Sequence, residues 1–393
     1  MKFLLCHNYY RQRGGEDESF ESEAALLESR GHSVVRYTVH NQEIDGMSNW
    51  TLARQTLWNR KTAKALRKII QTEKPTLMHC TNIFPLLSPA IYSAAKAEKI
   101  AVVQSVRNFR AGCLNALLLH KGSVCEDCLG KIFPWRGIVR GCYRESRAAS
   151  SVVATSLTLQ RLTQKWSRFV DLYFAPTEFA RRKLIEAGLP KDRTVVKPNF
   201  VGIDPCQGDG QAGFAVFLGR LAPEKGIDTL LKAWTLLRHP IQLKIIGDGP
   251  LAEHVEHAAA VDPRIQWLGR LPQKDVLPIL GDAMCLVMPS IWYETFGRSI
   301  IEAYAKGTPV IASELGAMSE LVKDGKTGWY FPPGDARALA NRIDWLVENP
   351  VERAIMRDSA RREYLEKYTA ERNYDMLMEI YERAVSLSMG SKR

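Results

Sequence analysis

The segment ETFGRSIIE, residues 294–302, constrains this chain more than any other part of the sequence. The apolar run Met284–Met288 before it predicts a buried parallel strand, and a polar turn follows that strand. Apolar residues then recur at helical spacing until Gly307 ends the pattern. The sequence therefore predicts that Glu294 lies in a loop and that Glu302 lies about one turn inside a helix.

The glycine and the acidic residues of this turn indicate what kind of ligand it suits. Gly297 permits the close approach of a ligand to the backbone, and the N–H groups after it point along a helix dipole suited to phosphate. The carboxylate of Glu294 can accept hydrogen bonds from sugar hydroxyls. Two acids at this spacing also arise as solvated surface charges, so the neighbouring segments must decide.

A second strand and turn lie upstream, in FAVFLGRLAPEKGIDTLLKAW from Phe214. This segment predicts a strand, a tight turn with Arg220 and Lys225, and an amphipathic helix. Two cations at the carboxyl end of a strand are well placed to neutralise a diphosphate, although exposed loop charges would look the same. The apolar face of the predicted helix is formed by Ile227, Leu230, Leu231 and Trp234.

Two further strand ends are rich in glycine. IQLKIIGDGPL, from Ile241, ends in a turn with Gly247 and Gly249, and RIQWLGRLP repeats the pattern from Arg264 to Pro272. Glycine at a strand end is common turn chemistry, so each segment is informative only as part of a set.

As a set, these segments resemble the donor domain of the retaining, GT-B-fold glycosyltransferases of glycosyltransferase family four, also called glycosyl transferases group 1. The resemblance rests on FLGRLAPEKGID, IIGDGPL, ETFGRSIIE, EAYAKGTPVIAS and ELVKDGKTGWYFPPGD, and it covers most of residues 196–365. At the amino terminus, HNYYRQRGGEDES from His7 matches the glycine loop of the family.

The resemblance implies an α/β fold of the GT-B type, with two Rossmann-like domains facing across a cleft. The acceptor-binding domain is expected to span residues 1–200, with a cysteine-bearing insertion at 107–147. Residues 201–365 are expected to bind the nucleotide-sugar donor, and the helix at about 366–393 to cross back to the first domain. The polar, glycine-rich stretch Asn199–Gly213 marks the boundary.

The resemblance also implies roles for individual residues. Arg220 and Lys225 would hold the donor diphosphate, Glu302 would accept the ribose hydroxyls, and Glu294 would contact the donor sugar, so that Glu294, Arg220 and Lys225 act in catalysis. The residues expected to bind the donor are Gly14, Gly15, Gly219, Gly247, Leu268, Phe296, Gly297, Arg298, Ser299 and Glu302.

The expected cofactor is a UDP- or GDP-sugar, without a catalytic metal. Glycosyl transfer develops negative charge on the departing diphosphate, which preorganised cations and a helix dipole can stabilise. No carboxylate cluster with metal-ligand spacing accompanies these motifs in the sequence. Retention of anomeric configuration is implied by the resemblance alone.

One position departs from the family pattern. Many relatives have a histidine where VVQSVRNFRAGC has Arg107, which together with Asn108 and Arg110 forms the acceptor-side candidates. A guanidinium cannot act as a base, but it can clamp an acceptor phosphate with two hydrogen bonds. An arginine that forms a salt bridge at a domain edge is the open alternative.

Four of the eight cysteines lie close together in the sequence, as Cys113, Cys125, Cys128 and Cys142. The central CEDC has the spacing of half a zinc knuckle, but the second pair is missing. A cytosolic setting disfavours disulfides, so structural zinc and reduced thiols in an ordered loop both remain open.

Positive charge is concentrated in the first half of the chain, where residues 1–200 hold 31 Lys and Arg against 17 Asp and Glu. Two clusters favour an anionic membrane surface or a lipid-linked diphosphate acceptor, with solvated helix faces as the alternative. No nucleic-acid-binding motif accompanies this charge, so nucleic acid is not an expected partner. The first cluster is a basic amphipathic helix with Arg54, Arg60, Lys61, Lys64, Arg67, Lys68, Leu52, Leu57, Leu66, Ile69 and Ile70. The second combines Lys131, Arg136, Arg140, Arg144 and Arg147 with Phe133 and Trp135.

The combined interpretation is a cytoplasmic glycosyltransferase, peripherally associated with the inner face of the membrane. It would move a sugar from a nucleotide diphosphate to a glycan or lipid-linked acceptor in the biosynthesis of cell-surface polysaccharide or glycolipid. The opening MKFLLCHNYY is too short an apolar segment for a signal peptide and is predicted to be the first strand. A nucleotide-sugar epimerase of GT-B fold and a non-catalytic nucleotide-sugar-binding partner remain as alternatives.

Overall fold

The computed structural model describes residues 1–164 and 168–390. Contacts within the chain divide it into two compact units. The first unit comprises Met1–Leu118, Cys125–Pro198 and the end of the chain from Asn373. The second comprises Leu119–Val124 and Asn199–Arg372.

The second unit is built on a parallel six-stranded sheet with the order β11-β10-β9-β12-β13-β14. This is the strand order of the Rossmann fold, with its topological switch point between β9 and β12. The strands are β9 (Phe214–Leu218), β10 (Gln242–Ile246), β11 (Ile265–Trp267), β12 (Cys285–Met288), β13 (Val310–Ser313) and β14 (Gly328–Phe331). The expected strands at 214, 241, 264 and 284 are therefore confirmed.

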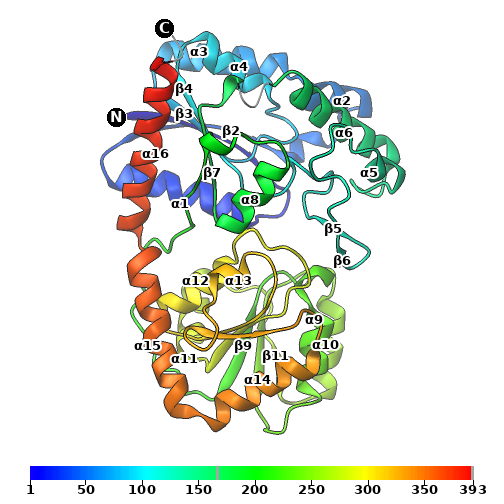
Figure 1. The fold of residues 1–393 in the computed structure, drawn as a ribbon, viewed down its shortest axis with the longest axis vertical. Coiled ribbons are helices and arrows are strands. Elements are labelled where there is room, and N and C mark those ends of the chain that lie inside the picture. The colour runs from blue at the N-terminus through cyan, green and yellow to red at the C-terminus, as the bar shows by residue number, and fades with distance from the viewer. Residues whose placement is uncertain (165–167, 391–393) are drawn as a thin grey trace. The chain divides into compact units, whose positions relative to one another are not determined.

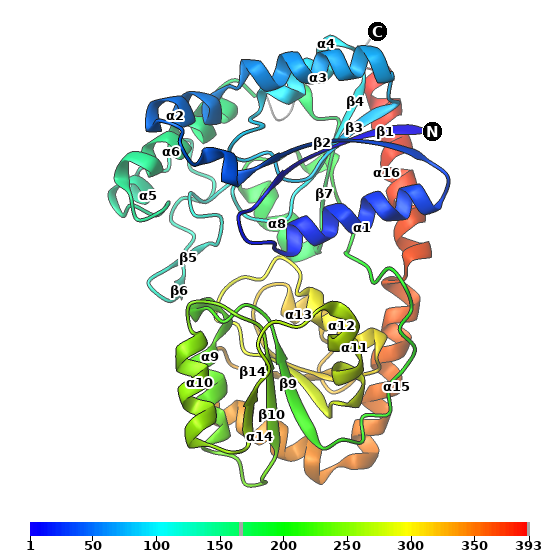
Figure 2. The same ribbon diagram turned by 180° about the vertical axis from the view of Figure 1, so that it is seen from behind.

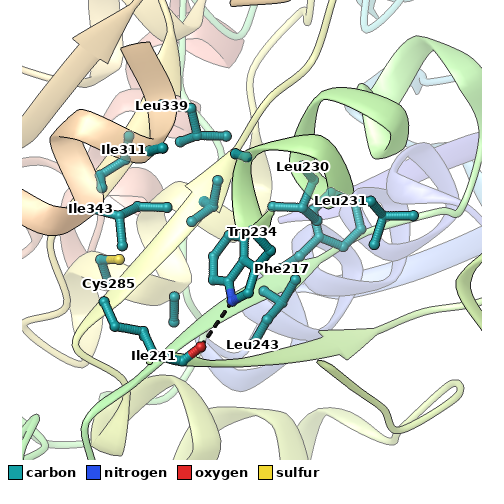
Figure 3. Packing of buried hydrophobic residues seen from close by; sticks show 14 of the residues in the cluster. Phe217, Leu230, Leu231, Trp234, Ile241, Leu243, Cys285, Ile311, Leu339 and Ile343 are labelled. Atoms are coloured by element: carbon teal, nitrogen blue, oxygen red, sulfur yellow. Dashed lines mark hydrogen bonds between the residues drawn. The ribbon is translucent and has the colours of Figure 1, made fainter. Parts of the chain in front are cut away.

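Helices cover both faces of this sheet (Figures 1 and 2). Because side chains alternate along a strand, Phe217 packs under α9, α10 and α14, whereas Val216 packs under α11, α12 and α15. Trp234 of α9 is fully buried among the first set, and its indole N–H donates to the Ile241 carbonyl at 3.0 Å (Figure 3). The helices are α9 (Ile227–Trp234), α10 (Ala252–Val261), α11 (Gln273–Asp282), α12 (Arg298–Ala305), α13 (Met318–Leu321), α14 (Ala336–Glu348) and α15 (Pro350–Lys367).

The first unit repeats this design with the order β2-β1-β3-β4-β7-β8, again parallel throughout. Its switch point lies between β1 and β3. The strands are β1 (Lys2–Tyr9), β2 (Ser33–His40), β3 (Leu77–Cys80), β4 (Ala101–Ser105), β7 (Leu172–Ala175) and β8 (Thr194–Val196). The helices are α1 (Gly15–Ser29), α2 (Asn49–Leu57), α3 (Arg60–Glu73), α4 (Ala90–Ala97), α5 (Trp135–Val139), α6 (Arg147–Leu162), α8 (Glu178–Glu186) and α16 (Ala370–Gly390). A short hairpin of β5 (Leu119–His120) and β6 (Ser123–Val124) interrupts the unit in sequence.

The prediction of one basic amphipathic helix over the first charge cluster is wrong. The chain forms α2 and α3 there, because Asn59 caps a new helix by accepting from the backbone N–H of Thr62. The apolar side of α3, with Leu66 and Ile70, is buried in the unit and faces α4. Only the basic side of α3 is exposed. None of the described helices is long and apolar enough to cross a bilayer.

A cluster of buried charges joins five segments of the first unit. Glu23 of α1 accepts a hydrogen bond from Arg107 at 2.8 Å and forms an ion pair with Lys197 at 2.7 Å. His79 of β3 lies beside this carboxylate and shares a hydrogen bond of 2.9 Å with Tyr381 of α16. Burial alone would raise the pKa of Glu23, but Lys197, Arg107 and His79 lower it to about 2. Burial lowers the pKa of His79 to about 4, against the opposing effect of Glu23.

These pKa values predict that the stability of the first unit falls in acid. Between pH 6.5 and 4 the unfolded chain protonates His79 while the folded chain does not, so the free energy of unfolding should decrease by roughly 3 kcal/mol. Between pH 4.5 and 2 the protonation of Glu23 in the unfolded chain should lower it further. Urea titrations at each pH, monitored by hydrogen exchange of residues 1–118, would measure the free energy of unfolding of the first unit.

His79→Gln should reduce the decrease between pH 6.5 and 4, because it removes the titrating imidazole. His257→Gln, at an exposed position on α10 of the second unit, is the matched control. A His79→Gln protein with the same pH dependence as the original would contradict this assignment.

Candidate functional site

The loops that follow β9 and β12 are packed backbone against backbone at the switch point of the second unit. A Cβ atom on Gly226 would lie 1.9 Å from the Pro289 carbonyl oxygen, and Gly226 has a φ of 71°. The backbone N–H of Ile291 donates to the carbonyl of Glu224 at 3.0 Å. These two contacts fix the β9 loop against the β12 loop.

This packing brings two of the predicted catalytic residues together. The Nζ of Lys225 donates to Oε1 of Glu294 at 2.5 Å, and the hydroxyl of Ser290 donates to the same oxygen at 2.8 Å. The Glu294 side chain is only 8% exposed, so its charge depends on these partners. Trp292 completes the group, with its ring 5.4 Å from the Lys225 ammonium. Arg220, the third predicted catalytic residue, lies exposed just beyond β9.

The second acid of ETFGRSIIE lies where the sequence predicts. Glu302 is on α12, one turn after the helix begins, and is 9% exposed. Its carboxylate accepts from Nε of Arg298 at 3.2 Å and from the Gln273 side chain at 3.3 Å. Gly297 caps α12 in the left-handed region, with a φ of 90°, and leaves the first N–H groups of the helix without intrahelical partners.

The remaining donor-side predictions fall on both loop and core positions. Gly247 allows the loop after β10 to pack on the loop after β9, since a Cβ atom there would lie 1.8 Å from the Gly219 carbonyl oxygen. Leu268 and Ser299 are partly buried, and the Ser299 hydroxyl contacts the sulfur of Met288 at 3.2 Å. The Phe296 side chain is a core residue, 3% exposed and packed edge-on against Tyr368, so only its backbone remains available to a ligand.

In the first unit, the glycine loop follows β1 at the switch point. Asp17 holds this loop, because its carboxylate accepts from the Gly14 N–H at 2.9 Å and from Nε2 of buried His7 at 2.7 Å. Nδ1 of His7 accepts from the Asn82 N–H, which leaves the proton on Nε2. A Cβ atom on Gly14 or Gly15 would meet nothing within 4 Å. Packing within the unit therefore does not explain these two glycines, and their donor-binding role stays a prediction.

A cavity of about 110 Å³ lies in the same unit and brings the three acceptor-side candidates together. Arg107, Asn108 and Arg110 all contribute to its wall, together with Glu16. Asn108 donates to Glu16 at 2.9 Å, and the Arg110 guanidinium stacks 4.2 Å from the Phe84 ring. Its remaining wall mixes apolar and neutral polar side chains, among them Tyr92, Val153, Leu157, Thr81, Gln104 and Ser156.

Arg107 has the ion pair that the sequence left open as an alternative. Its guanidinium is 5% exposed and is paired with Glu23 inside the unit, 5.8 Å from the Phe174 ring. The side chain therefore lines the cavity while its charge is balanced by a buried partner.

The four grouped cysteines, which fall between residues 113 and 142, also share one neighbourhood in the fold. The pKa of Cys128 is raised to about 11, mainly by burial. Negative charge on the nearby sulfur atoms of Cys113, Cys142 and Cys125 contributes to the same increase. No disulfide joins cysteines in the described part of the chain. Over the same residues, no group of three or more His, Cys, Asp or Glu side chains is placed to hold a metal ion. Zinc binding would require these thiols to turn toward a common point, so it stays a prediction.

Three side chains of the donor-side site carried no sequence signal. Ser290 and Gln273 belong to common loop and helix-start sequences, and Trp292 looks like one more apolar residue of a turn. The loops after β9 and β12 and the first turns of α12 offer one lysine, two hydrogen-bonded carboxylates and the amino terminus of a helix. This combination suits a ligand that carries both an anionic group and several hydroxyls.

Two Rossmann-like units, each with a parallel six-stranded sheet, have the architecture of the GT-B fold. Among solved structures, the chain is similar to Anabaena HepE in complex with UDP, with a TM-score of 0.68, 17% identity and coverage of 96% and 99% of the two chains. It is also similar to sucrose-phosphate synthase from Thermosynechococcus elongatus, with a TM-score of 0.73, 16% identity and coverage of 98% and 100%. At these identities the likeness establishes the fold.

Two family descriptions match adjoining parts of the sequence. Residues 14–204 match Glycosyltransferase Family 4, and residues 208–363 match glycosyl transferases group 1. The chain belongs to glycosyltransferase family 4. One similar relative is a phosphatidyl-myo-inositol mannosyltransferase of Mycobacterium leprae, 32% identical over 253 residues. That match spans 60% of this chain and 66% of the relative.

Replacement of Lys225 should impair activity strongly. Lys225→Ala leaves the buried Glu294 carboxylate without its ion-pair partner and removes a cation from the switch point, so we expect kcat/KM to fall by roughly 100-fold or more. Lys232→Ala, an exposed lysine on neighbouring α9, is the matched control and should retain full activity. Steady-state kinetics of both variants, with thermal unfolding to verify folding, would test this, and a fully active Lys225→Ala would refute the role.

Metal analysis of the purified protein distinguishes structural zinc from reduced thiols at the four grouped cysteines. If they bind structural zinc, the purified protein should contain one equivalent, and Cys125→Ser with Cys128→Ser should abolish it while lowering thermal stability. Cys206→Ser removes an exposed thiol of the second unit and provides the control. Protein without zinc, whose stability is unchanged by a chelator, would establish reduced thiols instead.

Proposed function

We propose that this protein is a retaining glycosyltransferase that moves a sugar from a UDP- or GDP-sugar to a glycan or lipid-linked acceptor. The reaction would serve the biosynthesis of cell-surface polysaccharide or glycolipid at the inner face of the membrane. The observation that carries the proposal is the pairing of Lys225 with Glu294 at the switch point of the second unit, beside the amino terminus of α12.

In this proposal the leaving diphosphate is bound by cations and backbone groups. Its phosphates lie against Lys225, Arg220 and the first N–H groups of α12, which carry the positive end of a helix dipole. Negative charge grows on the diphosphate as the bond from the anomeric carbon to its oxygen breaks. Since Lys225 and the backbone groups of α12 are already held by the fold, they stabilise that charge with little reorganisation.

The two carboxylates bind the sugars of the donor. Glu302 accepts hydrogen bonds from the ribose hydroxyls, and Glu294 accepts hydrogen bonds from the transferred sugar. Lys225 then bridges the Glu294 carboxylate and the phosphate, so that one side chain positions both parts of the donor. The acceptor hydroxyl forms the new bond to the anomeric carbon on the face that the diphosphate leaves, and its proton passes to the leaving phosphate.

We place the acceptor at the cavity of the first unit. Its wall combines the amide of Asn108 and the guanidinium of Arg110 with aromatic and aliphatic side chains, which suits a ligand with polar and apolar parts. A glycolipid acceptor is supported by the mycobacterial relative, whose name describes a mannosyltransferase acting on phosphatidyl-myo-inositol. The structure of HepE with UDP supports a nucleotide donor, and a UDP-sugar is the first choice for testing.

The test is the release of nucleoside diphosphate from a panel of UDP-, GDP- and ADP-sugars, with a lipid extract as the source of acceptor. The intact protein should release diphosphate from one donor and label an extracted product. Glu302→Gln keeps the size of the side chain but removes the negative charge of the carboxylate that accepts hydrogen bonds from the ribose hydroxyls. This variant should reduce kcat/KM by roughly 10- to 100-fold. Glu320→Gln, on α13 of the same unit, is the matched control.

The outcomes of this panel separate the proposal from its rivals. An epimerase of GT-B fold would convert the donor sugar without an acceptor, and a non-catalytic partner would bind nucleotide without turnover. Nuclear magnetic resonance of the product reports the anomeric configuration, and inversion would overturn the retaining assignment.

A further inference from the structure

The first unit exposes a set of large apolar side chains around α5 and the end of α6. Trp135 is 56% exposed and Phe133 is 48% exposed, and the other members are similarly uncovered. Monomeric soluble proteins seldom leave such residues gathered on one surface unless it binds something. We define the apolar patch as Ile132, Phe133, Trp135, Val139, Leu159 and Leu162.

Hydrogen bonds hold these residues in one place. The hydroxyl of Thr158 on α6 donates to the Ile132 carbonyl at 3.2 Å, and the Arg161 guanidinium donates to the Lys131 carbonyl. The segment before α5 therefore lies along the last turns of α6, next to Leu159 and Leu162. Trp135 and Val139 are four residues apart on α5, which packs against α6 (Figure 1). The residues of the apolar patch thus come from two packed helices and the segment before α5.

Basic side chains surround the apolar patch. Residues 131–147 contain five Lys and Arg against one Glu. Arg136 and Arg140 share the single carboxylate of Asp127, at 3.1 and 2.7 Å, so their charge is only partly neutralised. Lys131, Arg144 and Arg147 are exposed. The surface therefore presents aromatic and aliphatic groups within a positively charged rim.

The other basic cluster of the unit, on α2 and α3, has fewer exposed apolar side chains. Leu66 and Ile70 of α3 are buried within the unit, so α3 offers charge without accessible apolar side chains. Charge alone draws a protein to an anionic surface, whereas apolar insertion is needed to hold it there. Among the described residues of α2 and α3, Trp50 is the one large apolar side chain that is exposed, at 84%, whereas the apolar patch has six within its basic rim.

We propose that the apolar patch docks on an anionic lipid bilayer, with Phe133 and Trp135 inserted at the level of the headgroups. Tryptophan and other amphipathic aromatic groups prefer that depth, and each Lys or Arg near the surface adds attraction to anionic lipid. This inference deepens the proposed function, because it would hold the first unit at the membrane that carries a lipid-linked acceptor, and it rests on that function for its biological purpose.

The charge of the rim argues for lipid over a second copy of the chain. In a symmetric dimer through this surface, the arginines of each protomer would face those of its partner, and like charges brought together oppose association. An anionic bilayer instead supplies the complementary charge over the whole rim.

Flotation with vesicles tests the proposal without any catalytic step. The protein should float with vesicles of phosphatidylcholine and phosphatidylglycerol, and binding should weaken about tenfold in neutral phosphatidylcholine or when NaCl is raised to about 0.5 M. Phe133→Ser with Trp135→Ser should reduce partitioning about tenfold or more. Lys131→Gln with Arg147→Gln should reduce binding to anionic vesicles and leave binding to neutral vesicles unchanged.

Val351→Ser with Ile355→Ser removes exposed apolar side chains from α15 of the second unit and should bind vesicles like the original protein. Donor hydrolysis in the absence of lipid should be the same for all variants, which separates this proposal from the catalytic one. Failure of the original protein to bind anionic vesicles, or unchanged binding by the aromatic variant, would overturn the proposal. A dimer in sedimentation velocity that the aromatic variant abolishes would assign the surface to self-association instead.

Discussion

The donor-side site depends on the close approach of two loops at one edge of a parallel sheet. Only a residue without a Cβ atom fits at Gly226, where the backbone meets the carbonyl of Pro289. That contact places Lys225 beside Glu294, and a bulkier residue at position 226 would force the loops apart. The electrostatics of the site therefore follow from a steric condition on the backbone, set by a residue that has no side chain.

Much of this architecture could be predicted from the sequence. Strands of a parallel sheet are buried on both faces, so they appear as short apolar runs, and both Phe214–Leu218 and Cys285–Met288 are found where such runs predicted them. The positions of Glu294 in a loop and Glu302 on a helix followed from apolar spacing and from Gly307. These features are local, because spacing along the chain determines which face a residue occupies.

What the sequence did not provide is the pairing of residues distant in the chain. Arg107 and Glu23 are 84 residues apart, and nothing near either position signals a buried ion pair. Phe296 lies within a ligand-binding motif, yet its side chain packs in the core against Tyr368. The break between α2 and α3 was missed because both segments carry basic residues on the same pattern, and a single asparagine cap at Asn59 separates them. Tertiary contacts decided the first two cases, and a local helix cap decided the third.

The buried charge cluster of the first unit has a consequence for the order in which the protein folds. Lys197 donates a hydrogen bond to the side chain of Asn373, and His79 shares a hydrogen bond with Tyr381. Asn373 and Tyr381 both belong to α16. During synthesis on the ribosome, the two sheets emerge long before this helix. Until α16 arrives, the first unit must hold Glu23 and its cations without a full set of partners and with part of its core uncovered. The six-stranded sheet of the second unit and its covering helices lie without interruption between Phe214 and Lys367. This unit can therefore complete its fold before the first unit does, because α16 follows it in the chain.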